Sequence, residues 1–174
     1  MQKSFHSFSA NGRKFKGIIG VCGGSTISPE VYEQVVEFGK IAAENSYAIA
    51  CGGLSGTMEA ACKGAKSAKN GGFTIGILPG HSKSSANPYV DLAIPTGIGE
   101  ARNIVLVSTA DAIVTVSGGA GTLSEMAFAW KLGKPICTLK NTGGWSARMA
   151  GKNIDPRRND TAYAAKSPKD AFEY

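Results

Sequence analysis

The chain has 174 residues, 43% of them apolar and 18% charged, which is typical of a globular chain long enough for one domain. Its 23 glycines are more than average, but this balance excludes collagen and a disordered chain. The apolar runs are far shorter than the roughly 18 residues that span a bilayer, and the polar N-terminal residues lack a signal-peptide centre. We therefore expect a cytoplasmic protein that does not enter a membrane.

The net charge of +6 is concentrated in two peripheral segments. Residues 1–16 carry four basic residues and no acidic one, and residues 140–158 carry five basic residues and one acidic one. Between these segments, residues 17–139 hold eight basic and nine acidic residues. We interpret residues 1–16 as a basic leader and residues 17–174 as one domain. This distribution favours solvated ends or attraction of phosphate over a surface that binds nucleic acid.

Cysteine and histidine are too few and too scattered for a metal centre. The four cysteines, none of them in a CxxC pair, are Cys22, Cys51, Cys62 and Cys137. Most lie in or at the end of apolar runs, so we expect reduced thiols in the core. With only two histidines in addition, the sequence predicts neither a structural nor a catalytic zinc site.

Strands and helices are expected to alternate along the chain. Residues 17–25 form an apolar run that glycines interrupt, which indicates a buried strand entering a tight turn. Ser28 as N-cap and Pro29 at the first helical position then begin a helix that ends near Asn45. Further strands are expected at 47–51, 73–78, 92–94, 112–116 and 135–139, and further helices within 52–68, at 100–109 and at 122–132.

The C-terminal part is less regular. Residues 141–159 are glycine-rich and basic and yield no predicted element, whereas TAYAA at 161–165 indicates a last strand and Ser167 with Pro168 begins a short helix. Because parallel strands need crossover helices, the alternation predicts an α/β fold with a doubly wound, mainly parallel, Rossmann-like sheet and helices on both faces. Ligands of such sheets bind at the carboxyl ends of the strands.

Three of these strand ends carry glycine clusters, at 22–25, 51–59 and 117–125. Glycine lets backbone amides approach a ligand, and the following helix presents unpaired amides that bind anions such as phosphate. At a single turn, glycines that merely permit a tight connection explain the pattern equally well, but three turns at one sheet edge favour a site. Absence of GxxxxGK[ST], of a full GxGxxG and of GxSxG argues against a P-loop NTPase, an NAD dehydrogenase and a serine hydrolase.

Arg102 and Glu125 are candidates for a pair that flanks the anion. Thr122 and Glu125 also fit a capping box, which is a purely structural alternative. Arg102, however, is predicted in the first turn of a helix, where the helix dipole opposes a cation, so it should have a partner. If both helices begin at one sheet edge, Arg102 and Glu125 flank an anion held by the amides of residues 119–122. The alternatives for Arg102 are a surface pair with Glu100 or an oligomer contact.

Three segments, GEARN at 99–103, GGAGTLSE at 118–125 and LGKP at 132–135, resemble the Lonely Guy superfamily, whose members were long labelled lysine decarboxylases. The resemblance implies a phosphate held near residues 118–122 and a catalytic role for Arg102 and Glu125. Its enzymatic branch hydrolyses cytokinin riboside 5′-monophosphates to the free base and ribose 5-phosphate. We expect ligand contacts from Gly23, Gly24, Ser25, Gly52, Gly53, Gly56, Thr57, Met58, Asn103, Gly118, Gly119, Ala120, Gly121 and Thr122. True lysine decarboxylation is not expected, because no lysine lies in a recognisable pyridoxal phosphate sequence.

The sequence departs from the enzymatic hallmark in three places. Ser117 replaces a proline, CGGS at 22–25 replaces CGSS, and GEARN replaces HERK. All three are more similar to the shorter branch that includes molybdenum cofactor carrier proteins, whose ligand is a phosphorylated pterin. The first hypothesis is therefore a carrier-like binding protein that requires no cofactor of its own and whose ligand is molybdopterin, the molybdenum cofactor or a nucleoside monophosphate.

The second hypothesis is a phosphoribohydrolase, in which Glu125 orients or deprotonates water or a ribose hydroxyl and Arg102 stabilises the developing charge. We also expect a homodimer or homotetramer. Relatives of this type form such oligomers, and the predicted helices at 100–109 and 122–132 carry apolar residues on more than one face.

Overall fold

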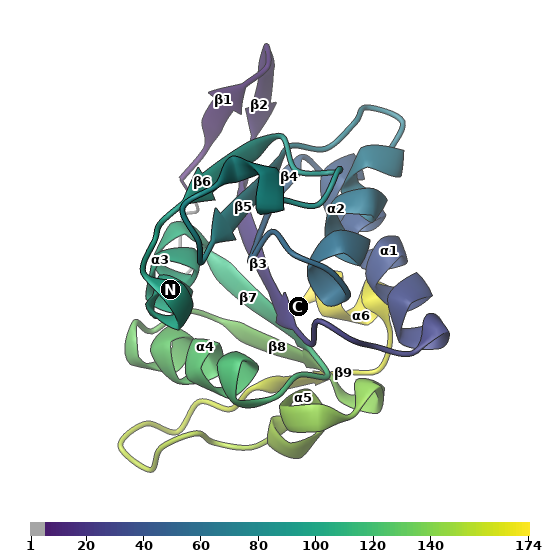
Figure 1. Cartoon of the computed structure of the whole chain (residues 1–174). Coiled ribbons are helices and arrows are strands. Elements are labelled where there is room, and N and C mark those ends of the chain that lie inside the picture. The colour runs from purple at the N-terminus through teal and green to yellow at the C-terminus, as the bar shows by residue number, and fades with distance from the viewer. Residues whose placement is uncertain (1–5) are drawn as a thin grey trace.

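Short apolar runs between glycine-rich turns form the central sheet in the computed structural model, which describes residues 6–174 (Figure 1). All neighbouring strands of this sheet are parallel, in the order β6-β5-β4-β3-β7-β8-β9. The strands are β3 (Gly17–Gly23), β4 (Tyr47–Cys51), β5 (Thr74–Leu78), β6 (Leu92–Pro95), β7 (Ala112–Val116), β8 (Ile136–Leu139) and β9 (Tyr163–Ala165). The central strands are buried on both faces, which explains their nearly continuous apolar sequences.

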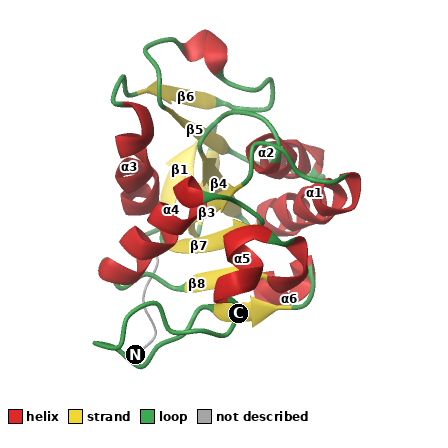
Figure 2. Ribbon diagram, turned by 60° about the horizontal axis from the view of Figure 1, so that its bottom comes forward, coloured by secondary structure: helices red, strands yellow, loops and turns green. Residues whose placement is uncertain are grey.

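Helices cover both faces of the sheet (Figure 2). On one face lie α1 (Pro29–Glu44), α2 (Thr57–Ser67) and α6 (Pro168–Glu173), and on the other lie α3 (Arg102–Thr109) and α4 (Ala120–Lys131). A further helix, α5 (Gly144–Met149), packs beside β7 and β8. Short 3-10 turns are η1 (Lys83–Ser85), η2 (Gly99–Ala101) and η3 (Lys140–Thr142). The predicted doubly wound fold is thereby confirmed.

Two apolar cores lie on the two sides of the sheet. Along β3, Ile19 and Val21 pack in the core with α1 and α2, and Cys22 packs in the core with α3 and α4. This alternation follows from the two-residue period of a strand. The four cysteines are buried and free, as predicted. Within residues 6–174, no helix combines the length and the apolar character that a membrane crossing needs.

Close packing of α1 on α2 depends on glycine. A Cβ at Gly39 would lie 2.2 Å from the carbonyl oxygen of Ala61, and a Cβ at Gly64 would lie 2.0 Å from the carbonyl oxygen of Val36. Real side chains never tolerate such distances, so only glycine lets these two helices approach so closely. The contact fixes the position of α2, whose first turn carries Met58.

The basic leader contains an element that its charge did not predict. Strands β1 (Phe8–Ala10) and β2 (Arg13–Phe15) form an antiparallel hairpin. The rings of Phe8, Phe15 and Phe73 pack together, and the guanidinium of Arg13 donates to the carbonyls of Asn70 and Gly71. This part of the leader therefore packs on the α2–β5 connection, whereas its residues 1–5 lie outside the described part of the chain.

Helix beginnings were predicted with mixed success. Ser28 and Ser167 are N-caps as expected, and their hydroxyl groups accept from the amides of Val31 and Asp170. The capping box of Thr122 and Glu125 is wrong, because α4 begins at Ala120 and its N-cap is Gly119, without a side-chain cap. Within residues 141–159, where no element was predicted, α5 follows η3.

Candidate functional site

The cavity at the carboxyl ends of the central strands is the candidate site. It lies where the strand order reverses between β3 and β7, and has a volume of about 430 Å³. This is the switch point at which doubly wound sheets bind ligands. The residues that line it are Val21, Cys22, Gly23, Gly24, Ser25, Thr26, Gly52, Leu54, Met58, Glu100, Arg102, Asn103, Ser117, Gly118, Gly119, Gly121, Thr122 and Glu125.

The three glycine turns converge here with Arg102 and Glu125, and most of the predicted ligand residues line the cavity. The exceptions are Gly53, Gly56, Thr57 and Ala120. Gly56 lies so close to the backbone of Ser25 that a Cβ would approach its carbonyl oxygen to 2.4 Å, and the amide of Thr57 donates to the carbonyl of Gly24 at 3.0 Å. Gly56 and Thr57 therefore position the first glycine turn, at residues 22–25, without lining the cavity themselves.

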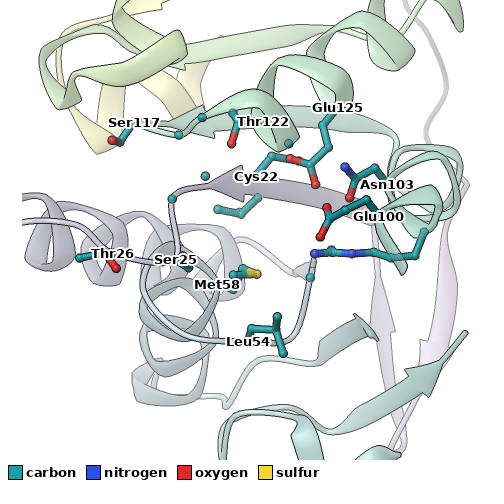
Figure 3. Close-up of a pocket in the computed structure, with 18 residues that line it drawn as sticks. Cys22, Ser25, Thr26, Leu54, Met58, Glu100, Asn103, Ser117, Thr122 and Glu125 are labelled. Carbon is teal, nitrogen blue, oxygen red and sulfur yellow. The ribbon is translucent and has the colours of Figure 1, made fainter. Parts of the chain in front are cut away.

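Sequence reasoning missed several lining residues, namely Val21, Cys22, Thr26, Leu54, Glu100 and Ser117. Most of them are sequence neighbours of predicted site residues and were identifiable only by that adjacency. The sequence suggests Glu100 only as a surface partner of Arg102. In Figure 3, Glu100, Asn103 and Glu125 lie at one end of the cavity, and Ser117 and Thr26 lie at the other.

A backbone cradle forms where β7 passes into α4. The carbonyls of Ser117 and Gly118 accept from the amides of Ser146 and Trp145, each at 3.0 Å, so α5 satisfies them. The amides in the first turn of α4 have no carbonyl one turn earlier to bond with, and the helix dipole places partial positive charge there. Within the turn at residues 117–122, the N–H groups at the start of α4, those of residues 119–122, are therefore available to an anion in the cavity.

Ser117 adopts a backbone conformation that proline cannot adopt. Its φ is +50°, whereas the proline ring fixes φ near −65°. The amide of Ser117 also donates to Oγ1 of Thr142 at 2.8 Å, and proline has no N–H to donate. The cradle of this chain is therefore built differently from one that begins with proline.

Replacing Ser117 by proline is expected to destabilise the fold by about 2 kcal/mol, through backbone strain and the lost hydrogen bond. Ser117→Gly is the matched control and should leave stability within about 0.5 kcal/mol, because glycine adopts positive φ readily and keeps the N–H. Urea unfolding of both variants measures the difference. Equal stability of the two variants would contradict this account of the turn.

Arg102 begins α3 and extends under the cavity. The residue is 6% exposed, and its Nε and Nη1 atoms are buried without a hydrogen-bond partner among the described residues. A Cβ at Gly52 would lie 2.2 Å from Nη1, so any other residue at this position would force the guanidinium to move. Within residues 6–174 Arg102 forms no ion pair within 4.0 Å, and the alternative of a surface pair with Glu100 is wrong. Because buried polar groups ordinarily have hydrogen-bond partners, these unused donors are available to an anionic ligand.

Asn103 connects the beginnings of α3 and α4. Its Nδ2 donates to Oγ of Ser124 at 2.9 Å, and this hydroxyl donates to the carbonyl of Gly121 at 2.7 Å. Its Oδ1 has no partner among the described residues, although the residue is only 2% exposed. Asn103 therefore positions the first turn of α4 and retains an unused acceptor.

Glu125 lies on the first turns of α4 and is 6% exposed. Burial raises the pKa of its carboxyl to about 7, and the negative charge of Glu100 also raises it. The positive charge of Arg102 and a hydrogen bond from Cys22 oppose this shift by lowering the pKa. Burial and the neighbouring Glu125 raise the pKa of the Cys22 thiol well above its ordinary value. Near neutral pH, Glu125 can thus exchange a proton.

The raised pKa of Glu125 predicts a pH-dependent stability. The folded protein binds this proton more tightly than the unfolded chain, so the free energy of unfolding should fall as pH rises from about 4.5 to about 7. The loss amounts to at most about 3 kcal/mol. Glu125→Gln should remove this slope and be more stable than the wild type at pH 8, whereas Glu37→Gln on the exposed face of α1 should retain it. Urea unfolding at pH 5 and pH 8 tests this, and an unchanged slope in Glu125→Gln would refute it.

Known proteins resemble the chain over nearly its whole length. A model of the SLOG cluster4 family matches residues 16–172, a range that contains every lining residue of the cavity. An uncharacterized protein from Archaeoglobus fulgidus is 43% identical over 122 residues, which are 70% of this chain and 79% of that protein.

Solved structures of molybdenum cofactor proteins are similar as well. The molybdenum cofactor binding protein from the phototrophic bacterium Rippkaea orientalis has a TM-score of 0.79 and 34% identity, over 90% of this chain and 93% of that one. The molybdenum cofactor carrier protein from Chlamydomonas reinhardtii has a TM-score of 0.76 and 32% identity, over 90% of this chain and 94% of that one.

Proposed function

The chain belongs to the SLOG cluster4 family, and from this premise we propose that it is a binding protein for a phosphorylated pterin, similar to the molybdenum cofactor carrier proteins. The phosphate would bind the cradle at residues 117–122, and the ring would lie toward Leu54 and Met58. The observation that carries the proposal is Arg102, a buried guanidinium with two unused donor atoms beside a helix N-terminus. No other described charged side chain in the cavity is a cation.

The fit of such a ligand rests on size and chemistry. A volume of about 430 Å³ falls within the range of about 300–1,000 Å³ that small-molecule sites occupy. The cradle and Arg102 supply donors for a dianionic phosphate, and Leu54 and Met58 supply apolar surface for a flat ring. A carrier needs only to bind, shield and release its cargo, so these contacts suffice without a bond-breaking step.

A phosphoribohydrolase is the second candidate, because Glu125 lies in the cavity with a pKa near 7 and could act as a general base. Arg102 would then stabilise the charge that develops on the departing base or sugar. Against this candidate stands Ser117, since the enzymatic branch that the sequence resembles has proline there, whereas the positive φ and the donated N–H of Ser117 are features that proline cannot reproduce.

Two measurements separate the candidates. Mass spectrometry of ligand extracted from the purified protein, and titration with molybdopterin, should reveal tight binding of a phosphorylated pterin. Incubation with AMP and an N6-substituted AMP should release no ribose 5-phosphate. Release that disappears in Glu125→Ala would reject the pure carrier and establish the hydrolase, and absence of any phosphorylated ligand or titratable binding would reject the carrier.

We also propose that the chain forms a homodimer or homotetramer. Ile104 and Val105 on α3 are only partly buried in the single chain, and they border a shallow hollow on its surface. Light scattering during size-exclusion chromatography measures the mass in solution. A mass of about 18.0 kDa, that of one chain, would contradict an oligomer.

A further inference from the structure

Phosphate binding leaves one end of the cavity unexplained. Glu100 on η2 and Glu125 on α4 both line it, and Figure 3 shows their carboxyl groups on the side of Asn103. Oε2 of Glu100 lies 3.8 Å from the position that a Cβ of Gly121 would occupy, and the charge of Glu100 acts on Glu125. Two carboxylates repel a phosphate, so this end must serve another part of the ligand. We call Glu100, Asn103 and Glu125 the acceptor end.

We propose that the acceptor end recognises the N–H donor edge of the ligand's ring, and specifically the adjacent ring N–H and exocyclic amine of a 2-amino-4-oxopyrimidine, as in pterin or guanine. This inference rests on the proposed function, because it needs the phosphate in the cradle to orient the ring.

The chemistry of the acceptor end matches that edge. An ionised carboxylate has only acceptors and can take two parallel N–H groups, and Oδ1 of Asn103 is a buried acceptor without a partner among the described residues. A 2-amino-4-oxopyrimidine presents two adjacent donors to such a group. Hypoxanthine keeps the ring N–H but lacks the amine. Adenine places a ring nitrogen with a lone pair where the ring N–H would be, so it faces the carboxylates with an acceptor.

Charge also fixes the orientation of the ligand in the cavity. The backbone amides of the cradle favour negative charge, whereas the carboxylates of the acceptor end, which adjoins the cradle at Gly121, disfavour it. A ligand with one phosphate and a donor-rich ring satisfies both ends at once. A ligand with phosphates at both ends, such as a sugar bisphosphate, would place negative charge against Glu100 and Glu125 and should bind poorly.

Three nucleotides whose purine rings present different hydrogen-bonding groups on one edge test the inference. Isothermal titration at pH 8, where Glu125 is ionised, compares GMP, IMP and AMP, with ribose 5-phosphate as the ligand that has no ring base. We expect GMP to bind about tenfold more tightly than IMP, and AMP to bind no better than IMP. Equal affinity for GMP, IMP and AMP would overturn the inference and leave the proposed phosphate site intact.

A single substitution tests the residue that sequence reasoning overlooked. Glu100→Gln, at an exposed position, should weaken GMP binding about tenfold and weaken ribose 5-phosphate binding not at all, while Glu37→Gln should change neither. Equal loss of GMP and ribose 5-phosphate affinity, or no loss, would overturn the inference. Absence of binding by every one of these ligands, ribose 5-phosphate included, would contradict the proposed function and the inference with it.

Discussion

Replacing Arg102 by methionine is expected to stabilise the protein and, at the same time, to weaken binding of a phosphorylated ligand about 30-fold or more. The guanidinium is buried, and Nε and Nη1 donate to no other described residue, so without a ligand the protein bears the cost of desolvating them. Methionine fills similar space without polar atoms. The free energy of unfolding should therefore rise by about 1–2 kcal/mol, or roughly 2–4 °C in Tm for each kcal/mol.

A variant that gains stability but loses ligand affinity distinguishes an arginine that binds ligand from one that supports the fold. Differential scanning fluorimetry gives Tm, and isothermal titration with ribose 5-phosphate gives the affinity. Arg148→Met is the control, because Arg148 is exposed and lies over the ring of Trp145, away from the cavity lining. It should leave the affinity unchanged. An Arg102→Met variant that is less stable than the wild type and binds as tightly would show that Arg102 serves the fold.

Much of the fold was predictable because its signals are local. The Ser28–Pro29 pair begins α1 as expected, and the short apolar runs become buried parallel strands. The convergence of Arg102 and Glu125 was predictable as well, because topology alone brings the carboxyl ends of parallel strands to one edge.

The errors arise where tertiary contacts override a local pattern. The spacing of Thr122 and Glu125 is that of a capping box, but the amides of Trp145 and Ser146 on α5 hold the preceding turn, and α4 begins two residues earlier. Helix α5 itself has little apolar periodicity and is held by buried hydroxyl groups, with Oγ of Ser146 donating to the carbonyl of Thr115 at 2.6 Å. Such contacts link residues about 30 positions apart, which sequence spacing does not reveal.

Glu100 was overlooked as a site residue for the same reason. Its neighbours Arg102 and Asn103 carried the motif, and an exposed glutamate beside them is ordinarily a solvated charge. Only the packing of α3 beside α4 brings its carboxylate near Gly121 and Glu125.

Gly121→Ala is expected to leave the fold intact and to weaken phosphate binding about tenfold or more. A Cβ at Gly121 would meet only Oε2 of Glu100 at 3.8 Å and Nδ2 of Asn103 at 4.0 Å, which are ordinary contacts. Alanine also favours a helix more than glycine does, by up to about 1 kcal/mol. The methyl group would nevertheless stand on the cavity wall, where the ligand must approach the first amides of α4.

The choice among glycines makes this experiment interpretable. Gly118 has a φ of +87°, and a Cβ there would lie 2.1 Å from Oγ1 of Thr122, so Gly118→Ala would disturb the turn and any lost binding would be ambiguous. Gly80→Ala is the matched control, because Gly80 has open space around it and lies outside the lining of the cavity. In titrations with ribose 5-phosphate, Gly121→Ala should bind more weakly than Gly80→Ala. The Tm values of both variants should stay within a few degrees of the wild-type value. Wild-type affinity in Gly121→Ala would mean that the anion does not approach the amides of α4, and the cradle would then have to be sought at the turn of residues 22–25.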